Sequence, residues 1–226
     1  MAGEEVDILS LMDMRASTYG LLARLFQKEV DGEALAQLQA MRFPTATGNA
    51  MVDEGYHQLY DYLKTAWDDS ITELAIDYVR TFVGHGVNGY SAAYPFESVY
   101  TSSRRLLMQE ARAEVLQVLR DNDLKRGSWN EGEDHIALEL EFMQRMSLRT
   151  ADALRGGDED ASVDLLATQR AFVRDHLLNW LPLLVTDMRL FSKTLFYQGL
   201  GQLTLGYVEE DAAILAELLD SAGVAA

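Results

Sequence analysis

Apolar residues recur with helical spacing along almost the whole chain. In VDILSLMDMRASTYGLLARLF, residues 6–26, they are separated by three or four positions or by sums of these, the period that places side chains on one face of an α-helix. Residues 51–67 and 71–83 repeat the pattern. No segment shows the alternation of apolar and polar residues, bounded by turn dipeptides, that is typical of a strand. The sequence therefore predicts an all-α protein.

Two irregular segments interrupt this pattern. The first runs from Gly84 to Pro95, and we expect one long helix after it, from Ser98 to about Arg120. The second is the polar segment of residues 121–133, after which the helical period resumes. Later in the chain, Pro182 predicts a kink or a stop.

The length and the number of breaks predict one globular domain. The 226 residues, at usual helix lengths, give a single helical domain, 1–226, of about nine to ten helices. We expect two lobes, an N-terminal one at about 1–120 and a C-terminal one at about 134–226, around a hinge at about 121–133.

Composition and charge exclude several classes of partner. The formal net charge of −17 disfavours nucleic acid and anionic membranes and favours basic ligands. The chain has no cysteine, which removes disulfides, thiolate nucleophiles and iron–sulfur ligation. The N-terminal segment is acidic where a secretory signal is basic, and the longest apolar stretch, residues 177–185, is far shorter than the ~20 residues of a membrane span. We expect a cytoplasmic protein without stable membrane insertion.

Three short motifs resemble known functional signatures but lack the sequence context that those signatures require. GHGVNG, residues 84–89, matches the dinucleotide-binding glycine pattern, but a helix rather than a strand precedes it. Glu54 and His57 have the spacing of one di-iron ligand pair, and no second pair exists among the four histidines. Arg104–Arg105 superficially resembles a twin-arginine export signal, but it lies in the middle of the chain.

The segment EGEDHIALELEFM, residues 131–143, allows several interpretations. Its acids could cap a helix and oppose the helix dipole. His135 and Glu139 lie one turn apart and could share a metal. A cap does not require a histidine, which would be unfavourable at the positive end of a helix if protonated. From the residues alone, Asp134–His135 remains a cap, a metal site or a binding contact.

The same segment resembles the Glu-(Pro)-Asp-His-Ile signature of the TorD/DmsD family, cytoplasmic chaperones that mature molybdenum-containing redox enzymes. AIDYVRTFVGHG followed by AAYPFESVY is similar to the family's helix, glycine loop and Pro-aromatic-x-Ser segment, and residues 172–188 and 195–204 resemble its C-terminal helices. The match spans roughly residues 15–205. Gly132–Glu133 stands where members usually carry a proline before Asp-His.

The resemblance implies a TorD-like all-α chaperone, either a monomer or a domain-swapped dimer. Such proteins bind the twin-arginine signal peptide of a molybdoenzyme precursor and hold it from export until the cofactor is inserted. This function needs no catalytic residue and no cofactor of its own. The resemblance implies a signal-peptide site of Pro95, Phe96, Ser98, Tyr100, Asp134 and His135, to which the residue chemistry adds Glu131. We expect the two contributing segments to face each other across a groove.

The residue chemistry is compatible with that site. Carboxylates accept forked hydrogen bonds from arginine, and the aromatic residues offer a wall for the apolar part of a signal peptide. Ser98 could alternatively cap the helix that follows it. The alternative function is a hydrolase, either metal-dependent through His135, Glu139 and Asp134 or nucleotide-dependent through the glycine loop 84–89.

Overall fold

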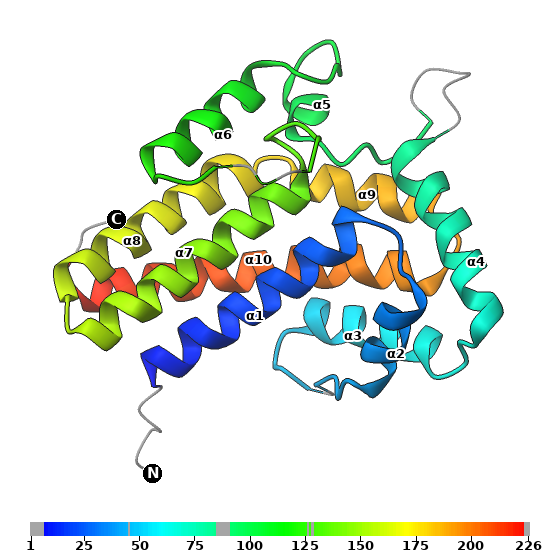
Figure 1. Ribbon diagram of the computed structural model, residues 1–226, viewed down its shortest axis with the longest axis horizontal. Coiled ribbons are helices and arrows are strands. Elements are labelled where there is room, and N and C mark those ends of the chain that lie inside the picture. Colours follow the sequence, from blue (N-terminus) through cyan, green and yellow to red (C-terminus); the bar gives the residue numbers. More distant parts are fainter. Residues whose placement is uncertain (1–6, 45, 85–90, 126, 128, 224–226) are drawn as a thin grey trace.

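The computed structural model describes residues 7–44, 46–84, 91–125, 127 and 129–223, and these form an all-α fold (Figure 1). Ten α-helices lie within the described residues: α1 Ile8–Gln27, α2 Gly32–Ala40, α3 Ala50–Leu63, α4 Asp68–Tyr78, α5 Glu97–Thr101, α6 Glu110–Asp121, α7 Ile136–Gly156, α8 Glu159–Phe172, α9 Leu181–Phe191 and α10 Leu195–Ser221. The π-helical turns Val79–Val83 and Val173–Leu177 extend α4 and α8. The prediction of a single all-α domain with nine to ten helices is confirmed.

The long helix α10 forms the centre of the molecule (Figure 1). It packs against α3 on one side and against α8 and α9 on others, while α1 lies along α7. These pairs join segments distant in sequence, because α1 and α3 come from the first half of the chain and α7 and α10 from the second. The boundaries expected for the two lobes stay a prediction.

A buried ion pair ties α1 to α10. Arg15 donates two hydrogen bonds to Asp211, from Nε to Oδ1 at 2.5 Å and from Nη2 to Oδ2 at 2.9 Å. The Tyr19 hydroxyl donates to the same carboxylate at 2.6 Å. Both charged groups are 1% exposed, so removal of one partner would leave the other charge buried without compensation.

The local helix signals predict the helix starts well. Asp31 accepts a hydrogen bond from the Ala34 amide at 2.9 Å and caps α2, as its position suggested. Pro182 occupies the first turn of α9, where a missing amide hydrogen costs nothing. The preceding π-helical turn ends at Leu177 and α9 begins at Leu181, so Pro182 marks a helix start rather than a kink within a helix.

The prediction of one helix from Ser98 to Arg120 is wrong. Helix α5 ends at Thr101 and α6 begins only at Glu110. Between them Arg105 and Met108 have φ values of 51° and 59°, which a right-handed helix does not accommodate. The Ser98 hydroxyl accepts a hydrogen bond from the Gln109 amide at 3.1 Å, which fixes the start of α6 against α5.

Among the described residues, no helix combines the length and the apolar character that crossing a bilayer would require.

Candidate functional site

The segments around Phe96 and His135 pair directly through their backbones. Phe96 and His135 form an antiparallel β-bridge, isolated from any strand. On either side of it, the Glu97 amide donates to the Asp134 carbonyl at 2.9 Å and the Ile136 amide donates to the Pro95 carbonyl at 3.0 Å. The two segments expected to share a site are therefore adjacent, and where the structure describes them, at residues 95–97 and 134–136, they are in direct contact rather than facing each other across a groove.

The His135 imidazole lies between two aromatic rings. Its centroid is 4.8 Å from that of Phe96 and 4.7 Å from that of Trp129, both edge-on. The side chain is almost fully enclosed, with 3% of its residue surface exposed. This packing joins the polar segment that precedes α7 to the segment that precedes α5.

His135 is the N-cap of α7. Its Nδ1 accepts a hydrogen bond from the Ala137 amide at 3.0 Å, so the ring carries its proton on Nε2 and is neutral. Burial lowers the pKa of His135 to about 3, because an apolar environment disfavours the charged imidazolium. A neutral imidazole avoids the unfavourable charge at the positive end of the helix.

Asp134 caps a different helix from the one it precedes. Its Oδ2 accepts a hydrogen bond from the Ser98 amide at 3.0 Å, in the first turn of α5. The residue is 1% exposed, and Oδ1 has no hydrogen-bond partner. Burial raises the pKa of the Asp134 carboxyl, partly opposed by the bond from Ser98. Ser98 therefore receives the cap rather than supplying it.

Two further buried acids lie behind this pair. Glu97 accepts hydrogen bonds from Asn179 Nδ2 at 2.8 Å and, through Oε2, lies 3.1 Å from His176 Nδ1. Glu139 is fully buried, and its Oε2 accepts from Trp180 Nε1 at 3.2 Å. Burial and the neighbouring carboxylates of Glu97 and Asp134 raise the pKa of Glu139 well above its usual range.

The seven residues of the expected site differ in exposure. Pro95, Ser98, Asp134 and His135 are buried, Phe96 and Tyr100 are half-buried, and Glu131 is exposed. The Tyr100 ring stacks on Trp180 at a centroid distance of 5.4 Å. Asp134 and His135 thus act on the protein's own backbone in this structure, and their role as ligand contacts stays a prediction.

The sequence interpretation missed Glu97, His176 and Asn179. Glu97 lies inside the Pro-aromatic-x-Ser segment, so its neighbours marked the place even though the acid itself was passed over. His176 and Asn179 come from and just after the π-helical turn Val173–Leu177. Nothing in their local sequence indicates that they meet Glu97, because that contact depends on tertiary packing.

The structure gives the metal interpretation no ligand set. Within the described residues, no group of three or more His, Asp or Glu side chains is placed to hold an ion. His135 Nδ1 is used by the Ala137 amide, and Glu139 Oε2 by Trp180. Of the glycine loop 84–89, only Gly84 lies within the described residues, and it follows a π-helical turn rather than a strand.

The fold and the paired segments define an all-α protein in which two segments rich in acidic and aromatic side chains are joined through their backbones. A protein-family model described as the nitrate reductase delta subunit matches residues 48–186. The chaperone protein TorD of Photobacterium profundum is 27% identical over 217 residues, which cover 92% of this chain and 97% of that protein. TorD of Vibrio cholerae is 26% identical over 95% of this chain and 97% of its own length. TorD of a Psychrobacter species is 28% identical, with 92% and 94% covered.

The chain belongs to this family, the TorD/DmsD family of molybdoenzyme-maturation chaperones. The family is one of chaperones rather than enzymes, so the expectation that this protein is not an enzyme is confirmed and the hydrolase alternative is set aside.

Proposed function

We propose that this chaperone binds the twin-arginine signal peptide of a molybdenum-cofactor-containing oxidoreductase in the cytoplasm and holds it from export until the cofactor is inserted. The observation that carries the proposal is the antiparallel pairing of Phe96 with His135. It joins the two segments that the family resemblance implicates, although they are 39 positions apart in the sequence. A peptide that contacts one segment therefore meets the other at the same surface.

Electrostatics support the same partner. The net charge of −17 attracts a basic peptide over a long range and speeds its capture. Glu131 is exposed and precedes His135 by four residues, and a carboxylate there can accept bonds from a guanidinium group. The half-buried rings of Phe96 and Tyr100, in the other segment, offer apolar surface for the apolar part of the signal.

A calorimetric titration tests the proposal. A peptide with the two arginines and the apolar stretch of a twin-arginine signal should bind the protein at least tenfold more tightly than the same peptide with both arginines replaced by glutamine. The affinity should fall as salt rises from 50 to 500 mM, since charge attraction is screened over about 10 Å at 0.1 M salt, and part should survive through apolar burial. Equal affinity for the two peptides would contradict the proposal.

A further inference from the structure

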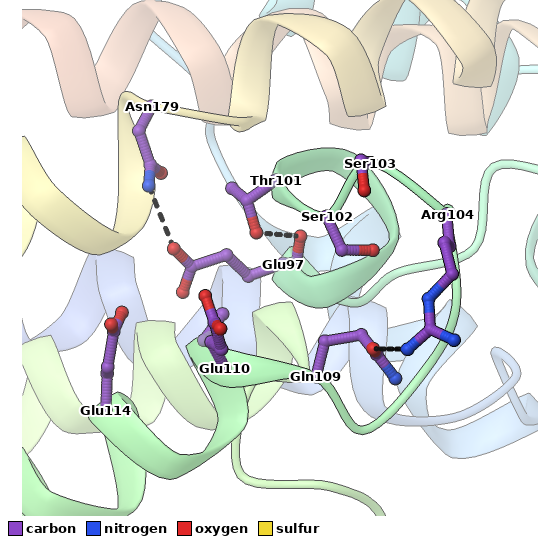
Figure 2. A pocket seen from close by; sticks show the side chains of 10 residues that line it. Glu97, Thr101, Ser102, Ser103, Arg104, Gln109, Glu110, Glu114 and Asn179 are labelled. Carbon is purple, nitrogen blue, oxygen red and sulfur yellow. Dashed lines mark hydrogen bonds between the residues drawn. The ribbon is translucent and has the colours of Figure 1, made fainter.

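A polar cavity of about 340 Å³ opens between α5, α6 and the turn before α9. Glu97 and Asn179 form one side of it, and Glu110 and Glu114 rise from α6 toward Glu97 (Figure 2). Arg104 lies at the opposite end (Figure 2). The cavity is adjacent to the paired segments, because Glu97 directly follows Phe96. It has room for the end of an arginine side chain.

Glu97 is held in a fixed orientation at the cavity. Only 2% of the residue is exposed, and its two carboxylate oxygens are held by Asn179 and His176 at 2.8 and 3.1 Å. Because the Glu97 side chain is already fixed, ligand binding costs little further conformational entropy at this residue. Glu110 and Glu114 are exposed on α6, so their side chains are free of packing that would prevent them from turning toward that ligand.

The buried carboxyl groups behind Glu97 are incompletely satisfied. Asp134 and Glu139 both interact with Glu97, and each has one buried oxygen without a hydrogen-bond partner. Among the described residues, neither of these acids nor Glu97 forms an ion pair with a lysine or an arginine. Burial and mutual repulsion raise the pKa of Asp134 and of Glu139, as expected where carboxyl groups meet without a lysine or an arginine, and a guanidinium group beside Glu97 would relieve that repulsion.

The cavity already has a guanidinium group at its edge. Arg104 donates from Nη2 to Gln109 Oε1 at 3.2 Å, and it forms no ion pair with Glu97, Glu110 or Glu114 among the described contacts (Figure 2). Arg104 and Arg105 are followed by Leu106 and Leu107. Two arginines followed by apolar residues is also the order of groups in a twin-arginine signal.

We propose that this cavity receives one guanidinium group of the client's twin-arginine pair, bound by Glu97, Glu110 and Glu114, and that Arg104 at its edge opposes this binding. The inference rests on the proposed function and names where the arginine binds. A guanidinium group has five N–H donors in a planar fork, so it can bond several carboxylates at once, which an ammonium group does less well.

A double-mutant cycle tests the carboxylates. The variant Glu110→Gln/Glu114→Gln should bind the twin-arginine peptide about tenfold more weakly than the parent protein. Peptides in which each arginine in turn is replaced by glutamine identify the coupled one: its loss should weaken binding to the parent strongly and to the variant by less than threefold. Both acids are exposed, so the variant should melt within a few degrees of the parent. The control, Glu209→Gln/Glu217→Gln, changes the net charge equally at two exposed positions on α10.

A second variant tests Arg104. Arg104→Gln should strengthen binding of the twin-arginine peptide about threefold or more, because a competing positive charge leaves the cavity. Arg120→Gln, an exposed position at the other end of α6, makes the same change in net charge and should have a smaller effect.

The outcomes separate this inference from the function on which it rests. If the parent protein does not distinguish twin-arginine from twin-glutamine peptide, the proposed function itself is wrong. If it does distinguish them, while the α6 and α10 double variants behave alike and neither arginine couples to the α6 acids, the cavity is not the arginine site. The proposed function would then stand and the signal would bind elsewhere.

Discussion

At the residue scale, the neighbouring residues Asp134 and His135 cap two different helices. An aspartate before a helix normally caps that helix, but Asp134 accepts from the Ser98 amide and caps α5. His135 caps α7 instead, through a neutral ring. The sequence could place both residues at a helix start. It could not assign the caps, because the Asp134 contact spans 36 positions and exists only in the folded chain.

The buried neutral His135 should make stability depend on pH. Its folded-state pKa is lowered to about 3 from 6.5, so between these values the unfolded chain binds a proton that the native chain does not. The stabilisation that the neutral, buried His135 contributes to the free energy of unfolding is therefore fully present above about pH 6.5 and is lost as the pH falls toward 3. Between pH 7 and pH 5 the loss should be about 2 kcal/mol.

Urea unfolding at both pH values checks this expectation. The variant His135→Asn keeps a capping oxygen but no titrating ring, so it should be less stable at pH 7 through lost ring packing and lose less stability on acidification. Asp134 and Glu139 titrate in both proteins and largely cancel in the comparison. A parallel loss of stability in parent and variant would show that His135 is not the group responsible.

At the element scale, helical periodicity predicts which segments are helices but not how closely they approach. Helices α3 and α10 cross where glycines face the partner helix. A Cβ atom built on Gly55 would lie 2.6 Å from the Leu203 backbone nitrogen, and one on Gly199 would lie 2.9 Å from the Gly55 carbonyl oxygen. In the sequence, both glycines look like weak points of their helices. The reason why glycine occupies these two positions is visible only in the packed pair of helices.

Alanine substitution should have opposite effects at two helical glycines. Gly55→Ala should destabilise the protein by about 2 kcal/mol or more, because a backbone contact cannot give way without moving a helix. Gly156→Ala, in the last turn of α7, has nothing within 4 Å of the added atom and should stabilise by up to about 1 kcal/mol through helix propensity. Thermal melts of both variants decide the matter, and a Gly55→Ala protein as stable as the parent would mean that α3 and α10 are not packed this closely.

At the scale of the whole molecule, the sequence predicted the fold class and the region of the site, while the tertiary contacts had to come from the structure. Periodicity and breaks depend on near neighbours, so the all-α class and most helix starts could be predicted. The pairing of α1 with α7 and of α3 with α10 joins distant segments, as does the meeting of Glu97 with Asn179. The break at residues 102–109 escaped prediction because no glycine or proline marks it.

The most direct test of the account is to map where a bound signal peptide lies. Asn130 is exposed and lies next to Trp129, whose ring contacts His135. A photo-crosslinking benzoylphenylalanine in place of Asn130 should capture a twin-arginine peptide, and excess unlabelled peptide, but not its twin-glutamine counterpart, should prevent the crosslink. The same group in place of Leu190, an exposed residue of α9, should capture little. Efficient capture at position 190 with none at position 130 would contradict the assignment of the paired segments as the signal-peptide site.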